Sequence, residues 1–342
     1  MFAGPNKPSD FAFIEASVIE PILTGVPLSI GRLETELETA GLHPSLIAQP
    51  AGSVPLFAVE RLLSKLGTVI GDQNVLYHVL DKEEKSDQRK AANVSLPVGM
   101  TGFESVVALI EKFDSVFSIH AFSCFIDGNN FWVLRRSNVT EWTDDWCTQQ
   151  YTLRALLSGV RQLMGKQQLV PTALHIANPP KDFLVPYSLR DVPYIASRST
   201  FGMAFSLEDL VVPPSFLLDP ISLTEQEKVH DEPEKLEADL IAYLSLVLGS
   251  ENTNVDASRV SKALGMSERT YRRKLSELGI GHRRTLAKAK LKNAIEMMTD
   301  ESNTITKIAV DLGYSDSAHF TRFFKSRMGV SPKAFRELNF AK

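Results

Sequence analysis

Apolar residues in the first two thirds of the chain follow two different spacings. In four stretches they recur every three or four residues, which is the spacing of an amphipathic helix. We therefore predict helices there, at residues 13–26, 54–71, 103–116 and 151–165.

The second spacing is typical of strands. Residues 117–137 hold two apolar, β-rich runs on either side of Asp127-Gly128-Asn129-Asn130, a sequence that favours a hairpin turn. The segments 172–178 and 193–206 also predict strands. Helices and strands do not alternate regularly, so the pattern predicts a mixed α+β domain rather than a row of βαβ units.

The last third of the chain has an almost wholly helical pattern, and a polar segment precedes it. Residues 219–233 are acidic, bounded by prolines and hold little to bury, so they predict a linker. We divide the chain into an α+β domain at 1–218, a linker at 219–233 and an all-α domain at 234–342. The helices expected in the all-α domain cover residues 234–248, 256–264, 267–278, 282–299, 304–312, 315–328 and 332–338.

The segment from Asp256 to Gly279 has the pattern of a helix-turn-helix unit. A short helix turns Val260 and Leu264 inward, Gly265 permits the left-handed backbone that ends it, and Ser267 is a natural N-cap for the next helix. In that second helix, residues 271, 275 and 278 share an inner face and a group of basic residues projects outward. A helix, a glycine-containing turn and a basic second helix together are typical of DNA-binding units.

The same pattern returns about 48 residues downstream. Thr304 is placed to cap the first helix of this second unit, Gly313 to end it, and Ser315 to cap the next. Phe320 and several neighbouring apolar side chains are expected to form a small core. Two such units in succession predict a protein that reads DNA with a tandem pair of helices.

Charge is distributed unevenly between the two ends of the chain. The whole protein has a net charge of −4, but residues 256–342 hold 18 Lys and Arg against 9 Asp and Glu, whereas the rest hold 19 against 32. A basic end in an acidic protein is expected to face a polyanion.

In a major groove, arginine can bind guanine with two hydrogen bonds, and Lys, Ser and Thr can hold phosphates. The candidate DNA contacts are Arg269, Arg272, Arg273 and Lys274 from the first unit, and Ser317, His319, Thr321, Arg322 and Lys325 from the second. The alternative is a solvated helix face, and His319 by itself fits a surface histidine as well as a DNA contact.

Composition argues against several other classes of protein. Cys124 and Cys147 stand alone, without the neighbours of a metal site or a redox pair. No Gly-rich phosphate loop is present, the N-terminus does not resemble a signal peptide, and no apolar run approaches the ~20 residues that cross a bilayer. We expect a cytoplasmic protein that is not an enzyme and has no metal, cofactor or membrane segment.

The residues from Asp311 to Arg336, "DLGYSDSAHFTRFFKSRMGVSPKAFR", resemble the signature of the AraC/XylS family of transcription regulators, and "LGMSERTYRRKL" resembles its first unit. The likeness covers about 234–338. Two positions differ from the usual family residue: Lys290 replaces an arginine, and Tyr271 stands where leucine is common. The resemblance implies that the two units, joined by a rigid helix at about 282–299, enter successive major-groove segments roughly 34 Å apart.

Residues 1–215 more weakly resemble the effector-binding domain of one branch of this family. That likeness implies a small-molecule sensor, often a homodimer, so the chain is expected to be a transcriptional activator that works with operator DNA, RNA polymerase and an effector. Arg135, Arg136 and Arg198 are candidates to meet an acidic ligand, although each also fits an ordinary surface arginine. The alternative function is a constitutive DNA binder whose N-terminal domain only dimerises.

Overall fold

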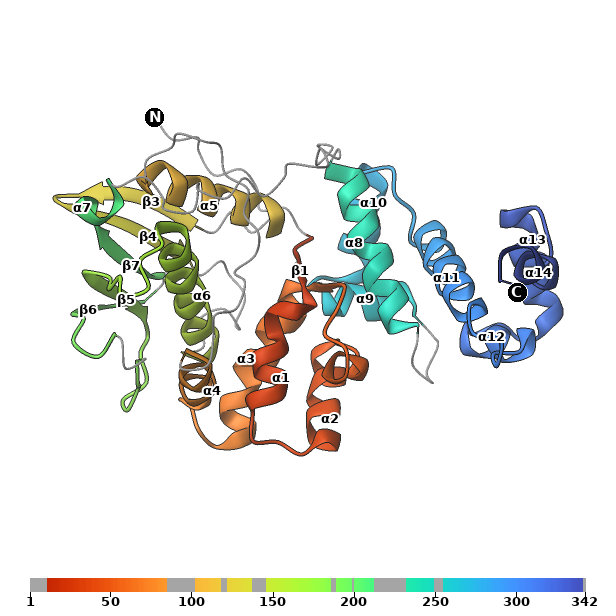
Figure 1. Ribbon diagram of the computed structural model, residues 1–342, viewed down its shortest axis with the longest axis horizontal. Helices are drawn as coiled ribbons and strands as arrows, with labels where there is room; N and C mark the ends of the chain where they lie inside the picture. The colour runs from red at the N-terminus through yellow and green to blue at the C-terminus, as the bar shows by residue number, and fades with distance from the viewer. Residues whose placement is uncertain are drawn as a thin grey trace. The chain divides into compact units, whose positions relative to one another are not determined.

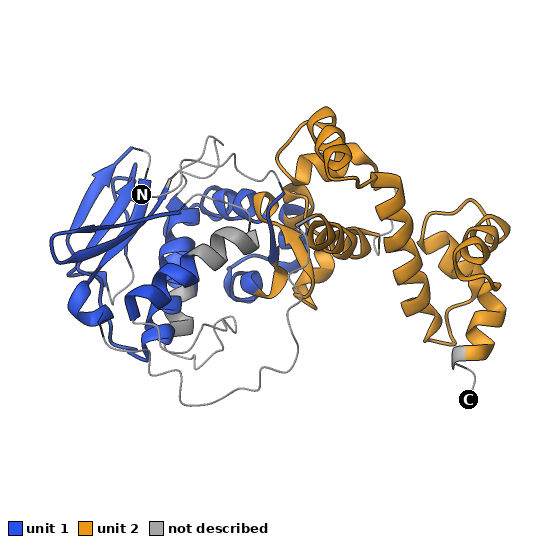
Figure 2. Cartoon of the chain, turned by 90° about the horizontal axis from the view of Figure 1, so that it is seen from above, with its two compact units in different colours: residues 1–14, 18–36, 59–227 blue, residues 15–17, 37–58, 228–342 orange. Residues whose placement is uncertain are grey.

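The computed structural model describes residues 11–84, 102–117, 122–136, 146–185, 189–198, 200–211, 232–248 and 255–340. The chain forms two compact units, coloured separately in Figure 2. Unit 1 comprises residues 1–14, 18–36 and 59–227, and unit 2 comprises residues 15–17, 37–58 and 228–342. The predicted linker at 219–233 lies outside the described residues except for its last two, with which helix α8 begins.

Unit 1 is built on a five-stranded sheet. Its strands lie in the order β3-β4-β7-β5-β6, and their neighbours are antiparallel except for β5 and β6, which are parallel. Asp127 pairs with Asn130, so a two-residue turn joins β3 to β4 and the predicted hairpin is confirmed. The strands are β3 (Phe122–Asp127), β4 (Asn130–Arg136), β5 (Ala173–Ala177), β6 (Tyr194–Ser197) and β7 (Thr200–Ser206).

Helices pack beside this sheet and close its core (Figure 1). Val133 on β4 and Met203 on β7 are fully buried against apolar side chains of α5 and α6. Residues 201–205 of β7, the central strand, are buried without a break, so this strand is covered on both faces. The helices that lie wholly in unit 1 are α1 (Glu20–Gly25), α4 (Val75–Glu84), α5 (Gly102–Phe117), α6 (Trp146–Met164) and α7 (Leu207–Leu210).

The prediction of one helix over residues 13–26 is wrong. This stretch forms a short strand, β1 (Phe13–Glu15), a 3-10 turn, η1 (Ala16–Ile19), and then α1. Pro21 lies in the first turn of α1. Proline has no N–H and disfavours helical backbone in the residue before it, so it is tolerated where a helix begins and opposes a helix that runs through it.

The C-terminal part of unit 2 is all helical, as predicted, so the chain combines an α+β part with an all-α part. The seven expected helices are all present: α8 (Glu232–Val247), α9 (Ala257–Ala263), α10 (Glu268–Glu277), α11 (His282–Met298), α12 (Ile305–Asp311), α13 (Ser317–Met328) and α14 (Pro332–Phe340).

Unit 2 also contains a segment from the N-terminal third, residues 37–58, which we refer to as the insert. It holds the end of α2 (Ile30–Ala40), the 3-10 turn η2 (Pro44–Ile47), β2 (Ser53–Pro55) and the start of α3 (Leu56–Ile70). The predicted division of the chain had placed this segment with the N-terminal domain. Its buried residues, among them Leu42, Leu46 and Val54, contribute to the core of unit 2.

Candidate nucleic-acid interface

The first helix-turn-helix unit consists of α9, a tight turn and α10. Asp256 caps α9 by accepting a hydrogen bond from the Arg259 backbone N–H at 2.8 Å. Ser267 caps α10 by accepting from the Thr270 N–H at 3.2 Å, as the sequence predicted. Gly265 ends α9 at a φ of +70°, a left-handed conformation that favours glycine. The angle between the two helices therefore depends on residues that the sequence identifies locally.

Tyr271 anchors α10 in the core of this unit. Its ring is fully buried, and its hydroxyl forms a 2.9 Å hydrogen bond with Nδ1 of His282, the first residue of α11. Burial lowers the pKa of His282, so the neutral imidazole is favoured in the folded protein. Tyrosine at this position thus joins the recognition helix to the following helix through a polar contact that a leucine would not make.

The outer side of α10 holds the predicted basic residues. Arg269, Arg272 and Arg273 are exposed, and Lys274 is half-buried. Arg272 binds Glu268 at 2.8 Å, and Arg273 binds Glu277 at 2.5 Å. Sequence reasoning had overlooked these two carboxylates, although their spacing of four residues from the arginines is the signal of a helical ion pair.

Exposed pairs of this kind contribute only a few tenths of a kcal/mol to folding, about 0.3–0.5 kcal/mol on a helix. Their weak binding means that a phosphate or a guanine can replace the carboxylate at little cost. The pairs therefore hold the two arginines only weakly against the helix surface.

The second helix-turn-helix unit repeats this design with α12 and α13. Thr304 caps α12 by accepting from the Lys307 N–H at 3.1 Å, and Gly313 has a φ of +71°. The predicted cap of the second recognition helix is wrong by one residue. Asp316, not Ser315, accepts the hydrogen bond from the His319 N–H at 2.6 Å, while the Ser315 hydroxyl donates to the Asp316 carboxylate. A carboxylate at this position also complements the positive end of the helix dipole.

Aromatic side chains form the core of the second unit. Phe320 and Phe324 have no solvent-exposed surface, and their ring centroids are 5.8 Å apart. Phe324 also contacts Phe335 of α14 edge-on, at a centroid distance of 5.4 Å. Tyr314, in the turn, contacts Phe320 and Phe323. The aromatic residues of the signature thus build the core, because a unit this small needs large apolar side chains to bury enough surface.

The outer side of α13 presents the remaining candidates. His319, Arg322 and Lys325 are exposed, and Ser317 and Thr321 are half-buried. Among the described residues, Arg322 and Lys325 have no ion-pair partner, in contrast to Arg272 and Arg273 of α10. The His319 ring contacts Tyr314 edge-on at a centroid distance of 5.2 Å, so its position depends on the turn.

Helix α11 joins the two helix-turn-helix units and is part of the core of each. Near its start Thr285 and Ala289 are fully buried, and near its end Ala294 and Met298 pack with the aromatic core of the second unit. Its 17 residues correspond to about 25 Å at 1.5 Å per residue. Figure 1 shows α11 between α10 and the group α12–α14.

Lys290 is one of the two departures from the family pattern. It faces the second helix-turn-helix unit from α11. Its amine lies over the Tyr314 ring, 4.5 Å from the ring centroid. Burial lowers the pKa of Lys290. A cation on an aromatic face is held by electrostatic attraction, so lysine connects α11 to the turn of the second unit.

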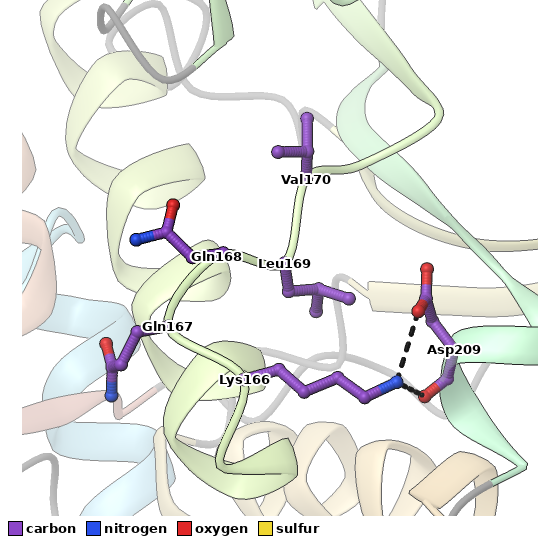
Figure 3. Close-up of a pocket in the computed structure, with 6 residues that line it drawn as sticks. All are labelled: Lys166, Gln167, Gln168, Leu169, Val170 and Asp209. Carbon is purple, nitrogen blue, oxygen red and sulfur yellow. Dashed lines mark hydrogen bonds and ion pairs between the residues drawn. The ribbon is translucent and has the colours of Figure 1, made fainter.

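Unit 1 offers a separate recess of about 470 Å³ (Figure 3), lined by Lys166, Gln167, Gln168, Leu169, Val170 and Asp209. The Lys166 amine donates to the Asp209 carbonyl at 2.9 Å and to its carboxylate at 3.1 Å. Because that carboxylate balances the lysine charge, the recess suits a polar ligand with its own donors and acceptors better than a simple anion.

The predicted ligand arginines differ in their surroundings. Arg135 is 6% exposed, so the interpretation as a surface arginine is wrong for this residue. It forms an ion pair with Glu60 and a hydrogen bond to the Thr152 hydroxyl at 3.3 Å, and it lies over the Phe201 ring. Arg198 is exposed, and nothing is described for the side chain of Arg136. A guanidinium already bound to a buried carboxylate acts as a structural bridge inside unit 1.

Neither a metal site nor a membrane span is present in the part of the chain that the structure describes. No group of three or more His, Cys, Asp or Glu residues there is arranged to hold a metal ion. No helix among these residues is long and apolar enough to cross a bilayer.

Comparison with known proteins supports the interpretation of the two basic units. Residues 260–338 match the family model described as "Helix-turn-helix domain". The C-terminal part therefore contains a helix-turn-helix domain. The matched residues include α10, α11 and α13, so the match covers the second helix of each helix-turn-helix unit and the helix between them.

Similar proteins are named as transcription regulators. The chain is 27% identical over 219 residues to the ornithine utilization regulator of Pseudomonas aeruginosa, covering 57% of this chain and 63% of the relative. It is 30% identical over 148 residues to the transcriptional activator RhaS of Escherichia coli O139:H28, covering 43% and 48%. The transcriptional regulator VqsM of Pseudomonas aeruginosa is 37% identical over 76 residues, 22% of this chain and 23% of that protein. These alignments thus cover less than two thirds of each relative.

Among solved structures, the transcriptional regulator CdpR of Pseudomonas aeruginosa aligns with 63% of this chain and 71% of its own, at 19% identity and a TM-score of 0.29. A DNA-binding transcriptional dual regulator of Escherichia coli K-12 aligns with 29% of this chain and 97% of its own, at 20% identity and a TM-score of 0.27.

Proposed function

We propose that this protein is a sequence-specific transcriptional regulator that binds operator DNA through the two recognition helices of its AraC-type domain. The observation that carries the proposal is the repeat itself. Helices α10 and α13 both follow a capped, glycine-containing turn, and both present exposed basic residues beside a buried aromatic. Recognition helices of this kind place their first turns against base edges in a major groove.

The proposed contacts divide into two types. Arg269, Arg272 and Arg273 on α10 and Arg322 on α13 have the fork of donors that guanine accepts. Lys274, Ser317, Thr321 and Lys325 suit phosphates, which fix the position of the protein on the duplex without reading its sequence. His319, beside the turn of the second unit, is included as a weaker candidate.

We expect operator affinity to fall steeply as salt is raised, because each lysine or arginine on a phosphate releases condensed counterions. The logarithm of the binding constant should fall against the logarithm of salt concentration with a slope of about −0.9 for each phosphate contacted. Fluorescence anisotropy of the full chain with labelled operator, between low and physiological salt, measures this slope.

Two variants calibrate the salt experiment. Lys325→Ala should make the slope shallower by about one unit if Lys325 holds a phosphate. Arg198→Ala, which removes an exposed arginine of unit 1, should leave it unchanged. A slope near zero for the unaltered protein would contradict the proposed role of the basic residues.

Regulation by a small molecule forms the finer part of this proposal. Unit 1 would bind the effector, RNA polymerase would be the partner on DNA, and the chain would act as an activator in the form of a homodimer. The recess at Lys166 and Asp209 has the volume of a small polar metabolite. A relative named for ornithine utilization makes ornithine and other small amino acids the first compounds to test.

A ligand that binds the folded protein raises its midpoint of thermal unfolding. We expect at least one compound of an amino-acid and sugar panel to do so for the unaltered protein, and Asp209→Asn to reduce the shift if the recess is the site. Asp127→Asn, in the exposed hairpin of unit 1, is the matched control. If a broad panel gives no shift, the constitutive DNA binder becomes the better description.

A further inference from the structure

The insert covers one side of the first helix of the AraC-type domain. The side chain of Tyr243 on α8 is 1% exposed, and its hydroxyl donates to the Gly41 carbonyl at 2.8 Å. One turn earlier, Asp239 accepts a 2.8 Å hydrogen bond from the Ser53 hydroxyl. Leu240 and Leu244, on the same helix, have no exposed surface. Residues of the insert therefore supply polar partners to α8, and β2 of the insert lies beside this helix.

Helix α8 also binds α11, the helix that joins the two helix-turn-helix units. Glu237 forms an ion pair with Lys288 of α11 at 2.7 Å, and the Ser245 carbonyl accepts a hydrogen bond from Asn293 of α11 at 2.7 Å. Helix α8 thus contacts both the insert and α11. A shift of the insert along α8 would act on α11, and through α11 on the spacing of the two recognition helices.

The insert also directly contacts the turn of the first helix-turn-helix unit. A Cβ atom at Gly265 would lie 2.7 Å from the Phe57 ring, so the aromatic ring is packed against the backbone of this glycine. Gly265 sets the angle between α9 and α10 through its φ of +70°. Phe57 therefore limits how that turn can move.

The ends of the insert continue into unit 1 without a loop. The division between the two units falls after residue 36, inside α2 (Ile30–Ala40), and after residue 58, inside α3 (Leu56–Ile70). Helical backbone is stiff compared with a linker, since each residue is fixed by a hydrogen bond. The insert is consequently joined to the proposed sensor by two helices, in addition to the segment that precedes α8.

We propose that the insert is a structural part of the DNA-binding domain, and that the N-terminal part of the chain controls the first recognition helix through its contacts with α8 and the Gly265 turn. The surface of α8 that includes Asp239 and Tyr243 is its docking surface. This regulatory role rests on the proposed function, whereas membership of the insert in the DNA-binding domain does not.

Hydrogen exchange of the full chain, read by mass spectrometry, tests membership. Tyr243→Phe removes the hydrogen bond to Gly41 and keeps the ring, so exchange should rise about tenfold in the insert and in α8 together, with unit 1 unchanged. Tyr151→Phe is the matched control, because the Tyr151 hydroxyl donates to the Val18 carbonyl within unit 1. It should raise exchange in unit 1 and leave α8 unchanged. If the insert instead responds to Tyr151→Phe and not to Tyr243→Phe, the proposal is overturned.

Operator affinity tests control of the recognition helix. Gly265→Ala and Gly279→Ala carry the same backbone cost, since their φ values are +70° and +69°, but a side chain at residue 279 would meet no atom within 4 Å. Gly265→Ala should therefore weaken operator binding about tenfold more than Gly279→Ala, and adding Phe57→Ala to it should restore most of the difference.

The outcomes separate the two proposals. Equal losses for both glycine variants, or no rescue by Phe57→Ala, would show that the insert does not act on the turn. Failure of the unaltered protein to bind any operator would contradict the proposed function. In that case the exchange experiment with Tyr243→Phe and Tyr151→Phe still decides whether the insert belongs to the DNA-binding domain.

Discussion

Replacing Phe324 by alanine is expected to lower the free energy of unfolding of the second helix-turn-helix unit by about 3–5 kcal/mol. The side chain has no exposed surface and contacts the rings of Phe320 and Phe335, so its removal leaves a cavity that the three short helices around it fill poorly. A loss of this size approaches the whole stability of a small domain, which is about 5–15 kcal/mol.

Hydrogen exchange of peptides from residues 305–340 in the full chain measures this loss locally. Amides of α12 to α14 should exchange much faster, while those of the unit 1 sheet keep their protection. Leu338→Ala is the control, because this leucine of α14 is 75% exposed and its truncation should change stability by less than about 0.5 kcal/mol. Similar exchange in both variants would mean that Phe324 is not part of the core, and that the aromatic residues of the signature have another purpose.

The second large effect concerns DNA. Arg273→Ala and Arg322→Ala should each weaken binding to the operator by about 1–3 kcal/mol, and weaken binding to random DNA less, if the two guanidinium groups read bases. Competition between operator and random duplexes in anisotropy experiments provides both values. Equal losses on the two kinds of DNA would assign these arginines to phosphates.

The ion pair of Arg273 supplies a control that the sequence alone did not suggest. Glu277→Gln breaks the contact with Arg273 and leaves the arginine in place. If Arg273→Ala acts only by disturbing the helix, Glu277→Gln should weaken binding by a similar amount. If Arg273 contacts DNA, Glu277→Gln should leave binding unchanged or strengthen it, because a competing carboxylate charge is removed. Arg322 has no such partner among the described residues and needs no corresponding variant.

The sequence predicted the helix-turn-helix domain well because its signals are local. An N-cap such as Ser267 or Thr304 lies within three residues of the N–H that it binds, and a left-handed glycine such as Gly313 ends its helix at its own position. Where the local signal was ambiguous, the prediction failed by a small amount. Ser315 and Asp316 are adjacent cap residues, and the carboxylate took the role.

Predictions for the N-terminal part were less complete for the opposite reason. Residues 13–26 have helical spacing, yet Pro21 and the tertiary surroundings produce a strand and a 3-10 turn before the helix begins. Arg135 was expected at the surface because arginine is usually exposed. Its burial depends on Glu60, 75 residues earlier in the chain, which no spacing rule connects to it.

By itself, the sequence determined the division into an α+β part and an all-α part. It also determined the repeat of the helix-turn-helix unit and the basic residues on the outer side of each unit. Each of these follows from side-chain periodicity, capping and charge within a few residues. Only the tertiary structure decided that the insert belongs to the same compact unit as the two helix-turn-helix units. The hydrogen bonds that attach it, Ser53 to Asp239 and Tyr243 to Gly41, join residues 186 and 202 positions apart. Contacts at that separation arise from the packing of whole elements, and the local pattern around each residue does not contain them.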